Sequence, residues 1–78
     1  MGFAMQITVK LFANFRLGRF ITADREFPVD TRIADVINCL QIQASEIGTI
    51  MLNNRHADPD RLLQDGDQLA LFPLVGGG

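Results

Sequence analysis

A chain of 78 residues has room for one small domain, which buries only about 60% of the surface that its unfolded chain exposes. Its 47% hydrophobic and 21% charged residues are typical of a folded protein rather than a disordered one. The formal net charge is -2, and no basic run occurs that could follow a phosphate backbone, so nucleic acid is not an expected partner.

Membrane and metal sites are also not expected. The apolar stretches, such as Leu69–Phe72, are far shorter than the roughly 20 residues of a membrane-spanning helix. The first residues lack the charged and apolar regions of a signal peptide, so we expect a cytoplasmic protein with no membrane partner. One cysteine, Cys39, and one histidine, His56, cannot build a disulfide or a Cys- or His-rich site, so we expect no metal and no bound cofactor.

The first predicted strand has one buried face. Apolar residues recur at every second position: Met5, Ile7, Val9 and Leu11. Phe12 falls in the polar phase of this strand, where an aromatic ring has no obvious core to enter. After a loop at Leu17–Gly18, a second extended segment covers residues 20–29, and Pro28 fits an edge strand or a strand end because it lacks an amide donor.

An amphipathic helix is predicted next. Asp30 and Thr31 offer side-chain oxygens for its N-cap, and we expect it to end within residues 41–43. Its apolar stripe follows the spacing i, i+3, i+4, i+7: Ile33, Val36, Ile37 and Leu40. Cys39 lies beside this stripe, where we expect a small side chain at the rim of the core rather than a reactive thiol.

The remaining sequence predicts two more strands. Residues 48–52 form an apolar run that ends at the turn signal Asn53–Asn54, and a loop follows over residues 57–60. Leu62–Leu63 is expected to cover the open end of the core. A tight turn at residues 65–67 then leads into the last strand, residues 68–72.

The order β-β-α-β-β predicts an α+β fold of the β-grasp (ubiquitin-like) type. We expect a mixed sheet of four to five strands with one main helix packed on one face. Placing the first and last strands as parallel neighbours at the centre avoids crossing connections. Periodicity alone leaves other α+β strand orders open.

Both ends of the chain resemble the MoaD/ThiS family of ubiquitin-like sulfur carriers. That family typically closes with a D-G-D turn, a hydrophobic strand, Phe-Pro and a terminal Gly-Gly, and residues 65–78 read DGDQLALFPLVGGG. Residues 9–16, VKLFANFR, resemble the family's opening strand followed by Phe-Ala and, three residues later, an Arg. The resemblance covers Met5 to Gly78, and Phe72–Pro73 is more similar to the MoaD branch than to ThiS.

The resemblance implies a carrier protein rather than an enzyme. A ubiquitin-activating-type adenylyltransferase uses ATP to convert the C-terminal carboxylate of Gly78 to an acyl-adenylate, and a persulfide-bearing sulfur donor enzyme then replaces AMP to leave a thiocarboxylate. In the MoaD branch the sulfur goes to molybdopterin or a related tungstopterin on a larger synthase subunit. In the ThiS branch it goes to the thiazole of thiamin.

Two other functions stay open at this point. A ubiquitin-like modifier would pass the same adenylate to lysines of other proteins, and Lys10 is the only lysine for chains of its own. A plain interaction module would keep its function without Gly77–Gly78. An independent enzyme is not expected, because the sequence lacks paired catalytic carboxylates, a nucleophile with its base and a phosphate-binding loop.

The C-terminal residues form a predicted flexible, glycine-rich tail, residues 74–78, after a domain of residues 1–73. Glycines lack side chains, so such a tail can thread a narrow channel, and it spans at most roughly 17 Å. We expect it to act through these residues: Leu74, Val75, Gly76, Gly77 and Gly78. A terminal glycine run alone is often only a disordered end, but the preceding turn, strand and Phe-Pro favour a functional tail.

A partner-binding patch is predicted on the open sheet face. Phe12, Phe72 and Ala70 share the outward phase of the first and last strands, which would bring them together if these strands pair. The alternative is that one ring folds over a sheet edge into the core. In the family the two aromatic positions bind partners, together with a large apolar residue in the loop after the third strand. That position is His56 here, an expected exposed or interface residue, and the free chain is expected to be a monomer.

Overall fold

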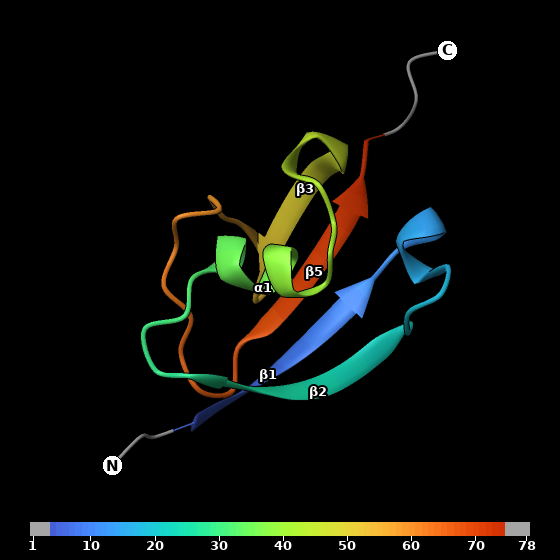
Figure 1. The fold of residues 1–78 in the computed structure, drawn as a ribbon. Helices are drawn as coiled ribbons and strands as arrows, with labels where there is room; N and C mark the ends of the chain where they lie inside the picture. The colour runs from blue at the N-terminus through green and yellow to red at the C-terminus, as the bar shows by residue number, and fades with distance from the viewer. Residues whose placement is uncertain (1–3, 75–78) are drawn as a thin grey trace.

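Alternating side chains build the first hairpin of the computed structural model, which describes residues 4–74 (Figure 1). β1 (Ala4–Leu11) buries Met5, Ile7, Val9 and Leu11 as predicted, and a short 3-10 helix, η1 (Ala13–Arg16), follows it. β2 (Thr22–Pro28) pairs antiparallel with β1, from Lys10 opposite Thr22 to Ala4 opposite Pro28. β2 is an edge strand, which confirms the interpretation of Pro28.

The helix α1 (Ile33–Cys39) is shorter than predicted, and its N-cap is Arg32. The Arg32 backbone amide donates to the Asp35 carboxylate over 2.9 Å. The prediction of Asp30 or Thr31 as the cap was wrong, because both residues form the turn after β2. Asp30 has a positive φ of 74°, and the Thr31 hydroxyl donates to the Pro28 carbonyl.

The helix ends early because the chain reverses after it. Gln41 has a φ of 59°, and the Arg19 side chain donates to the carbonyls of Leu40 and Gln41. Cys39 is exposed, so its expected place at the rim of the core was wrong. It lies two positions beyond the buried Ile37, roughly 200° around the helix axis and therefore away from the core. No helix within residues 4–74 is long and apolar enough to cross a membrane.

The second half of the chain supplies three strands after a short 3-10 helix, η2 (Ala44–Glu46). These strands are β3 (Ile47–Leu52), β4 (Arg55–His56) and β5 (Gln68–Pro73). Asn53 and Asn54 connect β3 to β4 with positive φ values of 52° and 68°, the geometry of a two-residue type I′ hairpin. The turn is confirmed, but β4 was not predicted, since two residues leave no periodic signal.

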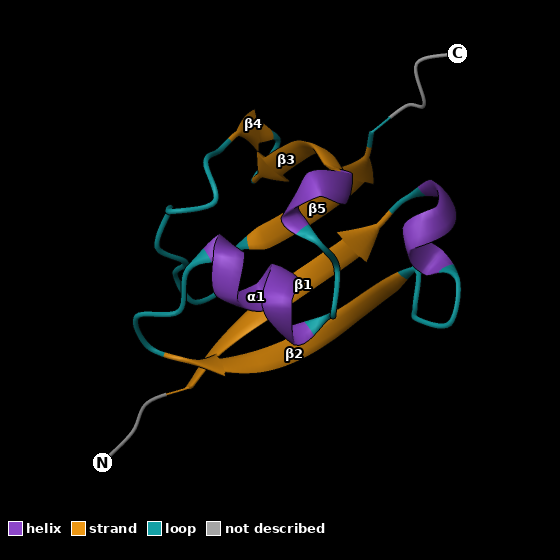
Figure 2. Cartoon of the chain, turned by 45° about the horizontal axis from the view of Figure 1, so that its top comes forward, coloured by secondary structure: helices purple, strands orange, loops and turns teal. Residues whose placement is uncertain are grey.

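The sheet order is β2-β1-β5-β3-β4, with β1 and β5 parallel at its centre. β3 pairs antiparallel with β5 on the other side. The helix α1 covers one face of this mixed sheet (Figure 2). The predicted β-grasp fold, a mixed sheet of four to five strands with one main helix on one face, is therefore confirmed, and of the strand orders left open the structure has the one with a central parallel pair.

The core fills the space between the helix and the inner face of the sheet. Leu69 and Leu71 of β5 have no exposed surface, and they face Ile33 and Val36 of the helix within the same buried cluster. Leu63 closes the open end of the core as predicted, whereas 43% of the Leu62 side chain is exposed. Only one residue of the expected leucine pair therefore covers the core.

The D-G-D turn places the start of β5 between its neighbours. Gly66 has a φ of 88°, and the Asp65 carboxylate accepts a hydrogen bond from the Gln6 amide over 2.8 Å. Asp67 is nearly buried, and its two carboxylate oxygens accept from the Asn53 side chain and from the Gln64 amide. The turn thereby joins β1 and the β3–β4 hairpin to the start of β5.

Candidate functional site

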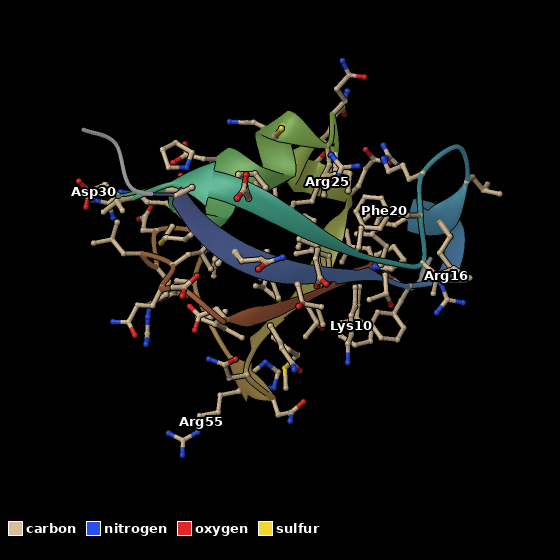
Figure 3. The ribbon with its side chains drawn as sticks, turned by 90° about the horizontal axis from the view of Figure 1, so that it is seen from below. Lys10, Arg16, Phe20, Arg25, Asp30 and Arg55 are labelled. Atoms are coloured by element: carbon tan, nitrogen blue, oxygen red, sulfur yellow. The ribbon has the colours of Figure 1, made fainter. Side chains whose placement is uncertain are left out.

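The open face of the sheet, opposite the helix, carries the predicted patch. Pairing across four strands aligns one row of side chains on this face: Lys10, Ala70, Met51 and His56. The flanking residues Leu11, Leu71 and Ile50 point into the core instead. Figure 3 shows Lys10 extending from the sheet on the side away from the helix.

The aromatic rings of Phe12 and Phe72 form a second row beside the first. Their centroids are 4.2 Å apart and their planes differ by 12°, so the rings stack. The Phe12 amide donates to the Leu71 carbonyl over 3.2 Å, which continues the β1–β5 pairing by one residue. Both rings are half-buried, and neither packs against the core cluster, so the alternative that one ring enters the core was wrong.

Arg16 holds the chain that carries the Phe12 ring. Its Nε donates to the Leu11 carbonyl over 2.7 Å, and its guanidinium carbon lies 5.4 Å from the Phe12 ring centroid. An exposed cation–π contact of this kind contributes about 0.5–1 kcal/mol. The Arg of the sequence motif therefore anchors both the loop after β1 and one ring of the stacked pair.

Charge is distributed unevenly along the open face. Lys10 and Arg16 lie at the end of the sheet where β1 and β5 finish (Figure 3). On the neighbouring strand β2, Asp24 accepts a hydrogen bond from the Thr8 hydroxyl, two positions along β1 from Lys10, and Glu26 lies opposite Gln6. The stacked rings therefore have Lys10 and Arg16 as cationic neighbours, and the acidic Asp24 and Glu26 lie further from the rings along β2.

Met51 is the residue of this face that the sequence reasoning missed. It lies opposite both Ala70 and His56, between Ile50 and Leu52, which are buried on the other face. Residues 47–52 are nearly all apolar, and such a run conceals its alternation. The turn at Asn53–Asn54 was the available signal, because it fixes which residues of β3 face outward.

His56 is exposed, as expected, but it lies in β4 rather than in a loop. Its position opposite Met51 puts it at the border of the open face. Within residues 4–74, no group of three or more His, Cys, Asp or Glu side chains could hold a metal ion. The role of His56 in partner binding stays a prediction.

The root of the tail, Pro73 and Leu74, lies directly beside the stacked rings. Pro73 pairs with Ile47, and the Leu74 amide donates to the Glu46 carbonyl over 2.9 Å. The Leu74 side chain is 61% exposed. The other predicted tail residues lie outside the described residues: Val75, Gly76, Gly77 and Gly78.

Solved structures with the same fold include archaeal and bacterial proteins. A protein from Pyrococcus furiosus, assigned as molybdopterin converting factor subunit 1, is 28% identical over 91% of this chain and 99% of that one, with a TM-score of 0.75. SAMP1, the small archaeal modifier protein 1 of Haloferax volcanii, is 25% identical over 94% and 99% of the two chains, with a TM-score of 0.73.

A third structure is a complex of subunits 1 and 2 of the molybdopterin-converting factor from Helicobacter pylori. It matches with 23% identity, 95% and 100% coverage and a TM-score of 0.57, a likeness that shows the fold alone. No match was found among curated proteins. A model of the ThiS family matches residues 9–78, nearly the whole described sheet and the glycine tail. The chain therefore belongs to the ThiS family of ubiquitin-like sulfur carriers.

Proposed function

We propose that this chain carries sulfur, as a thiocarboxylate on Gly78, to the dithiolene of molybdopterin or a related tungstopterin. The observation that carries the proposal is the position of the Phe12–Phe72 stack at the root of the glycine tail. An apolar aromatic surface there can dock on a partner while the tail enters that partner's active site. The resemblance to the Pyrococcus furiosus subunit favours the pterin pathway.

The chemistry requires partner enzymes, because an unactivated carboxylate is a poor acyl donor. A ubiquitin-activating-type adenylyltransferase would bind ATP and the tail together. A Gly78 carboxylate oxygen attacks the α-phosphorus of ATP, pyrophosphate leaves, and an acyl-adenylate results. The terminal sulfur of a donor persulfide then attacks the acyl carbon and AMP leaves, which gives an acyl disulfide. A thiol reductant cleaves its S–S bond, so that the carrier keeps the thiocarboxylate and the donor sulfur forms a disulfide with the thiol.

A larger synthase subunit would then receive the charged tail. The Helicobacter pylori protein forms a complex of subunits 1 and 2, and its fold is that of this chain, which supports an arrangement of this kind. In this proposal the chain itself is a small subunit and holds no cofactor. The thiazole of thiamin is the alternative sulfur acceptor, in keeping with the ThiS family model.

The test is intact mass spectrometry of the full chain after incubation with ATP, the adenylyltransferase and a persulfide donor. We expect one oxygen of the C-terminus to be replaced by sulfur, and no change in a matched chain that lacks Gly77–Gly78. An unchanged mass in the full chain contradicts the proposal. Incubation of the charged carrier with the synthase subunit and a sulfur-free pterin precursor then separates the pterin acceptor from the thiazole.

The second candidate is a protein modifier, which the likeness to the small archaeal modifier protein favours. Carrier and modifier share the adenylate and differ in the nucleophile that consumes it, a sulfur or a lysine amine. The same mass measurement distinguishes them, because a modifier adds its whole mass to other proteins. Stable conjugates without any thiocarboxylate would support the modifier and contradict the carrier.

A further inference from the structure

The three glycines within residues 4–74 are required for two different reasons. Gly18 and Gly66 have φ values of 69° and 88°, and a Cβ on either would meet nothing within 4 Å. Gly48 has no positive φ, so its backbone conformation is open to other residues. A Cβ there would instead lie 2.7 Å from the Pro73 carbonyl oxygen and 3.0 Å from the Leu74 Cα. Space, rather than conformation, therefore requires glycine at position 48.

The atoms in contact with Gly48 are backbone atoms of the tail root. Gly48 lies at an irregularity of the β3–β5 pairing, between the Ile47–Pro73 and Thr49–Phe72 pairs. One step earlier along the chain, the Glu46 carbonyl accepts the Leu74 amide over 2.9 Å. These contacts hold Pro73 and Leu74 against β3 for two residues beyond the stacked Phe72.

We propose that Gly48 is a positioning residue for the reactive tail. The close approach that it permits allows the Leu74–Glu46 hydrogen bond, and this bond fixes where the tail leaves the domain and in which direction. Four residues follow Leu74 in the sequence, so the Gly78 carboxylate can reach at most about 14 Å from this anchor. The role of Gly48 in activation rests on the proposed function, whereas its role in anchoring Leu74 does not.

A methyl group at position 48 would displace the tail root rather than β3. β3 is held by the buried side chains of Ile50 and Leu52 and by its pairing with β4 and β5. Pro73 is only partly buried and Leu74 is exposed, so less side-chain packing holds them in place. Gly48→Ala should therefore break the Leu74–Glu46 hydrogen bond and release Pro73 and Leu74 from β3, while Phe12 and Phe72 stay stacked.

The experiment measures tail anchoring and activation separately. Amide hydrogen exchange of Leu74 reports the anchor in the free chain, and ATP–pyrophosphate exchange with the adenylyltransferase reports activation of Gly78. For Gly48→Ala we expect Leu74 to lose its protection and the activation rate at saturating carrier to fall by roughly tenfold or more, because two further residues must be ordered at the partner. The dissociation constant should change little, since the stacked rings are kept.

Gly66→Ala is the matched control. It is also a Gly→Ala change at a described glycine, and it should destabilise the fold because its φ is 88°, but it lies at the opposite end of β5. We expect its Leu74 protection and its saturating activation rate to match the unsubstituted chain. Leu74→Pro is a second test, because it removes the amide donor of this bond and leaves Gly48 unchanged, and it should slow activation as Gly48→Ala does.

Two results would overturn the inference: a Leu74 amide that stays protected in Gly48→Ala, or an activation rate that is unchanged although protection is lost. If Gly48→Ala does not fold, Leu74→Pro tests whether loss of the Leu74–Glu46 hydrogen bond slows activation, and an unchanged rate would overturn the inference. Absence of activation in the unsubstituted chain would overturn the proposed function and the role of Gly48 in it. Leu74 exchange would still decide whether Gly48 anchors the tail root.

Discussion

The rings of Phe12 and Phe72 stack at a centroid distance of 4.2 Å, although they lie near opposite ends of the sequence. The parallel pairing of β1 and β5 brings them together, and Arg16 holds the backbone beside Phe12. An aromatic pair contributes about 0.5–1.5 kcal/mol beyond its burial. Both rings are nonetheless half-exposed on the open face, so their larger contribution is expected in a complex.

Phe72→Ala is expected to weaken both partner binding and the fold. The free energy of unfolding should fall by about 2 kcal/mol, from loss of the stacked contact and of the ring's partial burial. Binding to the adenylyltransferase should weaken by about 2 kcal/mol or more, roughly 30-fold in the dissociation constant, if the ring is a central interface residue. Urea denaturation and isothermal titration calorimetry measure the two quantities.

Phe20→Ala is the control for this substitution. Phe20 packs against the core, with the Arg25 guanidinium 4.9 Å from its ring centroid, and Figure 3 shows both away from Lys10. The control should lose stability and keep its affinity for the partner. Equal affinities for Phe72→Ala and the unsubstituted chain would contradict the assignment of the stacked rings as a docking surface.

Lys10 is expected to lie inside the docking surface, so that a bound partner and an acyl group on the Lys10 amine exclude each other. It is the only lysine, it is half-buried, and it lies opposite Ala70. A bulky acyl group on its amine would cover the patch. Modification with an amine-reactive biotin reagent should therefore raise the dissociation constant for the adenylyltransferase by about tenfold or more, as the loss of a hot-spot contact does.

The control moves the lysine to the other end of the molecule. Lys10→Arg with Gln64→Lys keeps one lysine, now at an exposed position in the loop before the D-G-D turn. The same reagent should leave the affinity of this variant unchanged, and the N-terminal amine reacts in both chains. Equal loss of binding in the two modified proteins would show that Lys10 lies outside the docking surface.

Local patterns were sufficient to predict the features that depend on one strand or one turn. Alternation placed the buried residues of β1, and the Asn53–Asn54 and D-G-D signals marked two turns with positive φ. The contact between Phe12 and Phe72 could be predicted once the first and last strands were assumed to pair. In each case the responsible residues are close in sequence, or are related by a single assumed strand pairing.

Features that depend on contacts between distant segments were not predicted. Arg32 caps the helix because Asp30 and Thr31 are used in the preceding turn. The approach of Gly48 to Pro73 is visible only when β3 and β5 are aligned, since an isolated glycine in an apolar run has several explanations. The orientation of Met51 depended in the same way on the β3–β4 turn.

Asp67→Asn is expected to destabilise the fold by about 1–3 kcal/mol. Both carboxylate oxygens of Asp67 accept hydrogen bonds, over 2.9 Å from the Asn53 side chain and over 2.8 Å from the Gln64 amide. An amide side chain would place an NH₂ group against one of these two donors. The free energy of unfolding from urea denaturation measures the effect.

Asp58→Asn makes the same chemical change at an exposed loop position. A surface substitution of this kind usually changes stability by no more than about 0.5 kcal/mol. Similar unfolding free energies for the two variants would contradict the role given to Asp67 in joining the D-G-D turn to the β3–β4 hairpin.

Asn53 and Asn54 are expected to respond in opposite directions to replacement by glycine. Both have positive φ, and type I′ turns favour the order Asn-Gly, so Asn54→Gly relieves strain and should raise the free energy of unfolding by about 0.5 kcal/mol. The side chain of Asn53 also accepts from the Gln68 amide and donates to Asp67, each over 2.9 Å. Asn53→Gly loses both bonds and should cost about 1–3 kcal/mol.

Urea midpoints, compared at equal denaturant slope, separate these two effects. The two variants share the conformational gain of glycine at positive φ, so their difference measures the side-chain bonds of Asn53. A loss of stability in Asn54→Gly, or none in Asn53→Gly, would mean that the turn is held by its backbone conformation alone. The expected order instead makes the Asn53 side chain the link between the β3–β4 turn and the start of β5.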